Sequence, residues 1–149
     1  MIVPVYAADD TSYTVQLEDG STVTYFSDGS KLTVSGVIED ESTTSTLATA
    51  KTVTKHREAT YTNGNGEVDW RYTLYATFSY VPGVSSTCTN TYYTQNIYEG
   101  NWTFSNGSAT KSGNKAYGKG TYELKVLFIT TKTCNIDISL TCDVNGNVT

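Results

Sequence analysis

The chain has 149 residues and a formal net charge of -5 at pH 7. This acidity argues against wholesale binding to nucleic acid or to anionic membranes, because both need a basic protein surface. The 27 Thr and 12 Tyr residues favour strands over helices, since β-branched and aromatic side chains suit a pleated surface. The length fits one domain with a substantial core.

The first eight residues, Met-Ile-Val-Pro-Val-Tyr-Ala-Ala, are typical of the end of a signal peptide. Val5 and Ala7 stand at the −3 and −1 positions of a cleavage point before Ala8. We therefore expect residues 1–8 to be the remaining end of a signal peptide and residues 9–149 to form a single β-sandwich domain of a secreted, extracellular protein. An edge strand is the alternative for this segment. No stretch approaches the roughly 20 apolar residues of a membrane span, so we expect none.

Two Asp-Gly turns follow, at Asp19-Gly20 and Asp28-Gly29, and each opens a short run of alternating residues. Together with residues 13–18 they predict a three-stranded meander. Residues 42–62 are rich in Thr and permit either one long strand or a short helix over 47–59. We favour the strand, because β-branched side chains lose conformational freedom in a helix.

The segment from Glu67 to Val81 gives the strongest strand pattern. Its even-numbered positions, from Val68 to Tyr80, are apolar, and most of its odd-numbered positions are polar. Such alternation places one face of a strand inward and the other outward. Three further strands are predicted over 87–98, 121–131 and 135–144, with turns at 99–101, 106–107 and 112–114.

About eight strands without a convincing helix predict an all-β fold, specifically an antiparallel β-sandwich, with a β-barrel as the alternative. The charges are segregated along these strands. Eight acidic residues against one lysine lie in 9–41, and five lysines against one glutamate lie in 111–132. Two interpretations stay open: solvated strand faces and turns, or complementary faces that meet within or between molecules.

The three cysteines of a secreted chain suggest one disulfide and one remaining thiol. Cys134 and Cys142 would lie roughly 26 Å apart on one strand, too far for a bond that needs Cα atoms within about 7 Å. Cys88 is then a partner in any disulfide, and we predict a Cys88–Cys142 bond with Cys134 as a small buried side chain. Three reduced thiols are the alternative.

Several motifs in the second half of the chain resemble small secreted β-rich proteins of Gram-positive, clostridia-like bacteria, most of which are uncharacterised. These motifs are Lys-Ser-Gly-Asn-Lys-Ala at 111–116, Thr-Cys-Thr at 87–89 and Leu-Thr-Cys-Asp-Val-Asn-Gly at 140–146. The resemblance covers about residues 67–147 and implies export and a β-rich fold, but no activity. In that pattern the paired cysteines fall at Cys88 and Cys142, and Cys134 departs from it.

Catalytic and metal-binding patterns are sparse. His56 is the only histidine, and no nucleophile-elbow motif accompanies it. Glu67 and Asp69 have a spacing that a glycosidase pair could use, but alternating acids on any strand would show the same spacing. No Cys and His residues have zinc-ligand spacing, and the Asp143–Asn147 turn lacks the downstream glutamate of a calcium loop. We therefore expect no catalytic residue, metal or cofactor.

The remaining signal is aromatic. Tyr75, Tyr93 and Trp102 are predicted at or near outward positions among Asn and Thr residues, where they would suit a protein partner or a sugar ring. Cross-strand pairing that stabilises the sheet is the alternative. These observations favour a non-enzymatic protein that binds an extracellular protein or glycan. A carbohydrate-binding module and a small hydrolase are the other hypotheses.

Overall fold

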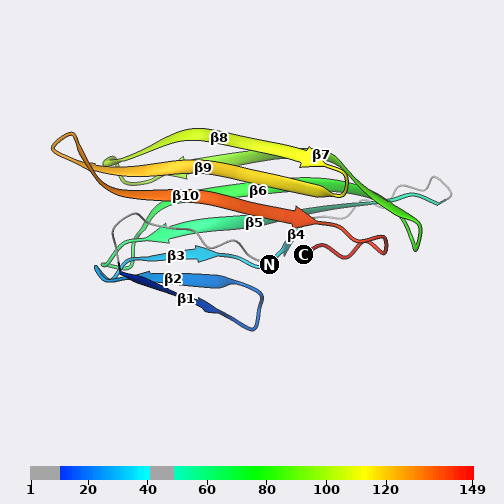
Figure 1. Ribbon diagram of the computed structural model, residues 1–149, viewed down its shortest axis with the longest axis horizontal. Coiled ribbons are helices and arrows are strands. Elements are labelled where there is room, and N and C mark those ends of the chain that lie inside the picture. Colours follow the sequence, from blue (N-terminus) through cyan, green and yellow to red (C-terminus); the bar gives the residue numbers. More distant parts are fainter. Residues whose placement is uncertain (1–10, 41–48) are drawn as a thin grey trace.

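The computed structural model describes residues 11–40 and 49–149, and its ten described strands form two antiparallel sheets that pack face to face (Figure 1). The larger sheet has the order β1-β2-β3-β5-β6-β7, and β4 pairs with β5. Its strands are β1 (Ser12–Gln16), β2 (Thr22–Phe26), β3 (Lys31–Val34), β4 (Ile38–Glu39), β5 (Lys51–Thr62), β6 (Val68–Val81) and β7 (Ser85–Ile97). The smaller sheet has the order β10-β9-β8 and contains β8 (Trp102–Ser112), β9 (Lys115–Val126) and β10 (Ile129–Thr141).

Both sheets remain open at their outer strands, so the predicted sandwich is confirmed and the barrel alternative is wrong. The predicted meander is confirmed as β1, β2 and β3. Residues 51–62 form a strand, as predicted, while the predicted signal-peptide end at 1–8 and the early part of the 42–62 segment lie outside the described residues. Across those described residues, no helix is long and apolar enough to cross a bilayer.

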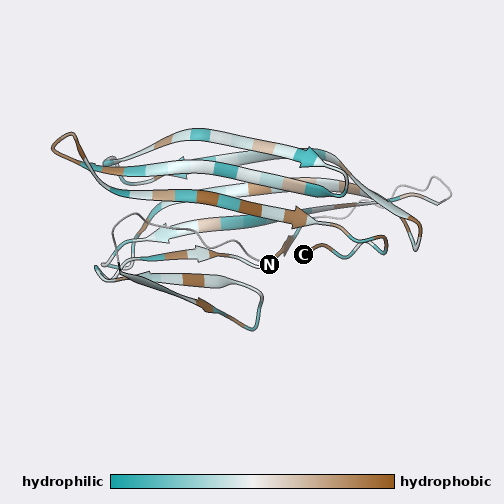
Figure 2. Ribbon diagram, in the orientation of Figure 1, coloured by the Kyte–Doolittle hydropathy of each residue, from teal (hydrophilic) through white to brown (hydrophobic). Residues whose placement is uncertain are grey.

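Alternation along β6 builds the centre of the core. Trp70, Tyr72, Leu74 and Phe78 are completely buried, and the Trp70 ring stacks on Tyr122 of the opposite sheet with centroids 3.7 Å apart. Figure 2 shows the same alternation of apolar and polar residues along β10. Its inward side chains, each at most 4% exposed, are Cys134, Ile136, Ile138 and Leu140.

The structure corrects two strand assignments. Asn106-Gly107 is not a turn between strands but an irregularity inside β8, where the pairing register shifts between Ser105 and Ser108 and Asn106 takes a φ of 54°. The predicted strand over 121–131 is also wrong, because the chain reverses at Leu127-Phe128 and these residues connect β9 to β10. The turn preferences of the residues therefore predict the structure at neither site: Asn106-Gly107 forms no turn between strands, and Leu127-Phe128 forms one.

Glycines in β9 let the aromatic core approach the smaller sheet. A Cβ atom on Gly120 would lie 2.5 Å from Phe104 Cε2, and one on Gly118 would lie 2.7 Å from the Tyr72 hydroxyl. Both separations are far inside van der Waals contact. The smaller sheet therefore needs glycine at these two positions for close packing.

We expect Gly120→Ala to lower the free energy of unfolding by about 1–2 kcal/mol, because the Phe104 ring must move to make room. Gly100→Ala is the matched control, since a Cβ at Gly100 meets no atom within 4 Å, and its effect should stay within about 0.5 kcal/mol. Urea denaturation measures both. Equal stabilities for the two variants would contradict this account.

Candidate functional site

Tyr75 lies on the outer face of the larger sheet, half-buried in a row of rings that crosses β5, β6 and β7. It stacks on Tyr92 with centroids 4.7 Å apart and an interplanar angle of 9°, and His56 lies 5.1 Å away on the neighbouring strand. Neighbouring rings therefore occupy both sides of Tyr75, which leaves no free face on which a sugar ring could stack. This arrangement matches the cross-strand pairing alternative.

The predicted outward positions of Tyr93 and Trp102 are wrong. Tyr93 lies opposite core residue Leu74 and stacks on Tyr72 with centroids 5.3 Å apart, so Tyr92 is the outward residue of this pair. Trp102 is 3% exposed, and its indole Nε1 donates a hydrogen bond of 2.8 Å to Asp69. Trp102 thus belongs to the core, and Tyr93 is partly buried against it.

Two of the residues considered for hydrolase chemistry, His56 and Asp69, are occupied by other contacts, while Glu67 is exposed before β6. His56 Nδ1 lies 2.8 Å from an Asp40 carboxylate oxygen, and its Nε2 lies 3.9 Å from Glu58. Both ring nitrogens thus face carboxylates rather than a nucleophile. The Asp69 carboxylate accepts hydrogen bonds from Trp102 and from the Asn63 amide, which gives it a structural role.

The Asp143 carboxylate is likewise engaged by hydrogen bonds within its own turn. Its carboxylate accepts hydrogen bonds from the backbone N–H groups of Asn145 and Asn147 and from the Asn147 side chain, which hold its pKa below the ordinary value. Among the residues that the structure describes, no group of three or more His, Cys, Asp or Glu side chains has a metal-binding arrangement.

The most unusual surface is the end of the β9–β10 hairpin, which we call the apolar tip and define as Val126, Leu127, Phe128 and Ile129. The exposed fractions of these side chains are 49%, 87%, 100% and 68%, in that order. The hairpin extends past the neighbouring strands at one end of the long axis (Figure 1), and it is apolar at its end (Figure 2). Four consecutive large apolar residues are therefore presented to solvent.

The backbone of the apolar tip is also unfavourable for its sequence. Val126 pairs with Ile129, and the two residues between them have positive φ angles, 50° at Leu127 and 67° at Phe128. Two-residue hairpin turns of this kind normally carry Asn and Gly, and the left-handed conformation costs other residues roughly 1–2 kcal/mol each. The residues at the apolar tip therefore do not serve to form the turn.

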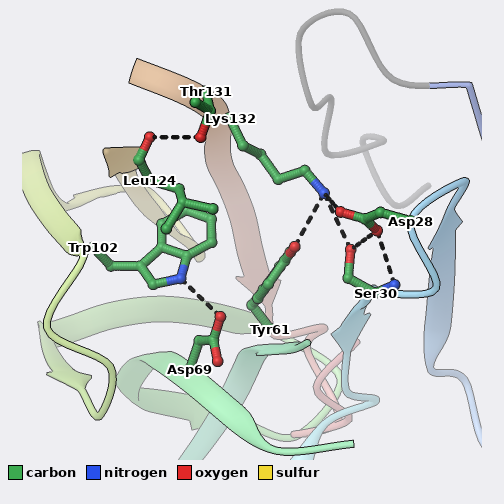
Figure 3. Close-up of polar contacts among 8 residues, drawn as sticks. All are labelled: Asp28, Ser30, Tyr61, Asp69, Trp102, Leu124, Thr131 and Lys132. Atoms are coloured by element: carbon green, nitrogen blue, oxygen red, sulfur yellow. Dashed lines mark hydrogen bonds and ion pairs between the residues drawn. The ribbon is translucent and has the colours of Figure 1, made fainter. Parts of the chain in front are cut away.

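A buried lysine holds the base of this hairpin against the larger sheet. Lys132 is 6% exposed, and its Nζ donates hydrogen bonds to Asp28 (2.7 Å), Ser30 (3.1 Å) and the Tyr61 hydroxyl (3.0 Å) (Figure 3). The ammonium also lies 4.4 Å from the centre of the Phe26 ring, within cation–π range. One pair of the segregated charges thus meets within the molecule and fixes the hairpin in place.

Asp28 makes this contact sensitive to pH. Burial disfavours its ionised form, but hydrogen bonds from Lys132 and Ser30 outweigh that effect and lower the pKa to about 2. Because this folded-state pKa lies below the ordinary 3.8, its contribution to stability is present above pH 4 and is lost as the pH falls through 2.

We expect Asp28→Asn to destabilise the protein by about 1–2 kcal/mol at pH 7, less than a fully buried pair would lose because half of the Asp28 side chain is exposed. Asp19→Asn is the matched control, since Asp19 makes the same turn contacts with Ser21 and has no lysine partner among the described residues. The difference between the variants should shrink between pH 4 and pH 2 in urea denaturation. A difference that is constant over this range would argue against the ion pair.

Cys88 and Cys142 flank one turn of the structure. The Cys88 N–H donates to the Gly113 carbonyl (2.8 Å), and the Cys142 N–H donates to that of the next residue, Asn114 (3.0 Å). Both cysteines are buried, unbridged thiols, so the structure does not contain the predicted bond, which stays a prediction. Burial raises the pKa of the Cys88 thiol, and the nearby Cys142 thiol adds to that rise.

The apolar tip was missed in the sequence because residues 121–131 satisfied a strand pattern. One signal was available: apolar residues occupy both faces from Leu124 to Ile129, which a strand exposed on one side does not need. The chain matches no protein-family model, and no curated protein or solved structure shows a significant similarity to it.

Proposed function

We propose that this chain is a non-enzymatic binding protein that acts outside the cell and docks onto an uncharged or zwitterionic lipid surface through the apolar tip. The single observation that carries the proposal is the full exposure of Phe128 beside the 87% exposure of Leu127 on a strained turn. The largest contiguous apolar patch on a protein surface, typically a few hundred Å², is often functional. The extracellular setting is supported by the signal-peptide pattern at 1–8 and by the resemblance to exported proteins.

The size of the apolar tip favours lipid over a protein partner. Burying a large apolar side chain contributes about 1.5–3 kcal/mol at about 25 cal/mol per Å², which corresponds to roughly 60–120 Å² each. Four such residues supply on the order of 300 Å² of apolar area, below the roughly 450 Å² of apolar area in the 800 Å² that each partner of a stable interface buries. Insertion into a bilayer interface has no such threshold, because each apolar group that leaves water contributes separately.

The charges behind the apolar tip favour a lipid surface without net charge. Lys125 lies 4.0 Å from Glu123, and Lys132 is paired with Asp28. Neither lysine therefore offers an uncompensated positive charge to anionic headgroups. The net charge of the chain, -5, points the same way.

Co-sedimentation with phosphatidylcholine vesicles tests the proposal. We expect the protein to bind, and we expect Leu127→Ser/Phe128→Ser to weaken binding about 10–100-fold, since two large side chains lose their burial in lipid. Val84→Ser is the matched control, because Val84 is 73% exposed in the β6–β7 turn at the opposite end and should leave binding unchanged.

Anionic lipid provides a second comparison. Adding phosphatidylserine to the vesicles should change the affinity less than about threefold, because the paired lysines are already compensated. The proposal fails if the protein does not bind vesicles, or if binding does not depend on Leu127 and Phe128. Retention of the protein by a purified extracellular protein instead of lipid would favour the protein-partner hypothesis.

A further inference from the structure

A cavity of about 470 Å³ opens between the two sheets, away from the apolar tip. We call it the arginine pocket. It lies where the β1–β2 turn and the segment after β3 approach β5, β9 and β10. Its lining includes Gln16, Val37, Arg57, Lys115, Ser139 and Thr141. A cavity of this volume is large enough for a small-molecule ligand.

Arg57 occupies an inward position of β5, opposite Leu74 of the core strand β6, where an apolar residue would be expected. It is 8% exposed, and its Nη1 donates a hydrogen bond of 2.6 Å to the Ser139 carbonyl on the opposite sheet. Its Nε is buried and has no hydrogen-bond partner. Of these two nitrogen atoms of the guanidinium group, Nη1 therefore has a hydrogen-bond partner and Nε has none.

The charge of Arg57 is not compensated by a carboxylate. None of the ion pairs within residues 11–40 and 49–149 includes Arg57. Burial lowers its pKa, with no opposing cause. A buried cation without a counter-charge costs several kcal/mol, so a protein that retains one gains by binding an anion there.

The charged side chains that line the arginine pocket besides Arg57 are Lys115 and Asp19, and Thr149 also lines it. Lys115 lines it and forms no ion pair among the described residues, while its Nζ lies 5.2 Å from the centre of the Tyr117 ring. Asp19 also lines the pocket, but one of its carboxylate oxygens accepts hydrogen bonds from the Ser21 N–H and hydroxyl. Two side-chain cations therefore line the pocket with one side-chain carboxylate, which is already engaged by Ser21.

We propose that the arginine pocket binds an oxyanionic group, a carboxylate or a phosphate or sulfate, on the guanidinium of Arg57, with Lys115 as the second cationic contact. The planar fork of a guanidinium matches the paired oxygens of such groups. Ser139 and Thr141 also line the pocket, and their hydroxyl groups are further possible donors to the anion. This site is separate from the apolar tip and does not depend on lipid binding.

Thermal unfolding in sodium phosphate, sodium glucuronate and sodium chloride at equal ionic strength tests the proposal. We expect a higher melting temperature with phosphate or glucuronate than with chloride. Tighter binding of phosphate would assign a tetrahedral oxyanion, and tighter binding of glucuronate would assign the carboxylate of an organic acid.

Two variants locate the site. Arg57→Met should weaken anion binding at least about tenfold, because it removes charged hydrogen bonds in a buried setting. Lys115→Ala changes a more exposed residue and should weaken binding about threefold. Lys51→Ala is the control, because Lys51 is exposed on β5 and does not line the pocket, so its loss should leave anion binding unchanged.

Arg57→Met also removes the hydrogen bond to Ser139, so nitrogen NMR of wild-type protein provides a measurement that needs no variant. Phosphate or glucuronate should shift the Arg57 Nε signal and leave that of Arg71 unchanged. The proposal is overturned if neither anion acts beyond chloride, if Arg57→Met binds as wild type does, or if the Arg57 signal does not move.

Discussion

Replacing Leu127-Phe128 by Asn-Gly is expected to stabilise the protein by about 1–3 kcal/mol and to abolish vesicle binding in the same variant. Both residues have positive φ angles, 50° and 67°, which Asn and Gly adopt at much lower cost. Their side chains are 87% and 100% exposed, so the folded protein loses almost no packing. Urea denaturation and vesicle co-sedimentation measure the two effects.

The combination of higher stability and lost vesicle binding distinguishes a role of these two side chains in binding from a role in folding. If the two side chains helped the hairpin to fold, the Asn-Gly variant would be less stable than wild type. If the two side chains had no role in folding or in binding, the variant would be more stable and would still bind vesicles. Only a binding role predicts a gain in stability together with a loss of binding, which is the usual conflict between stability and function at a site.

Oxidation is expected to join Cys88 to Cys142 and to raise the free energy of unfolding by up to about 4 kcal/mol. The two cysteines donate backbone hydrogen bonds to neighbouring carbonyls, Gly113 and Asn114, so they flank the same turn. Because burial raises the pKa of both thiols, we expect the bond to form slowly at pH 7 and faster at higher pH.

Peptide mapping of the oxidised protein should find the Cys88–Cys142 link, and urea denaturation with and without reductant should measure its contribution. Cys88→Ala should remove the difference between oxidised and reduced protein, while Cys134→Ala should keep it. A cross-link that includes Cys134, or an oxidised protein no more stable than the reduced one, would overturn the assignment.

The sequence predicts the core well where one physical rule dominates. The alternation from Val68 to Tyr80 identifies the inward side chains of β6, because burial on one face of a strand repeats every second residue. The Asp-Gly turns are equally readable, since glycine has a positive φ at both Gly20 and Gly29. The sandwich follows from these local signals.

The sites were not readable from local rules. Trp102 and Tyr93 face inward because of how the sheets pack, which alternation in a polar strand does not reveal. Leu127 and Phe128 form a turn that their own preferences oppose, so the chain reversal was hidden in an apolar run. Arg57 lies on the same inward face of β5 as Ala59 and Tyr61. Because arginine is charged, the sequence did not indicate that this position is buried.

The strand order has a consequence for how the chain could be divided. Among the strands that the structure describes, each sheet contains only strands that follow one another in sequence, and the chain passes between the sheets in the β7–β8 loop at 98–101. Cleavage at Gly100 would leave every sheet intact on its own fragment. Two separately produced pieces, 1–100 and 101–149, are thus natural halves for a split reporter, reassembling through the shared core that contains Trp70 and Tyr122.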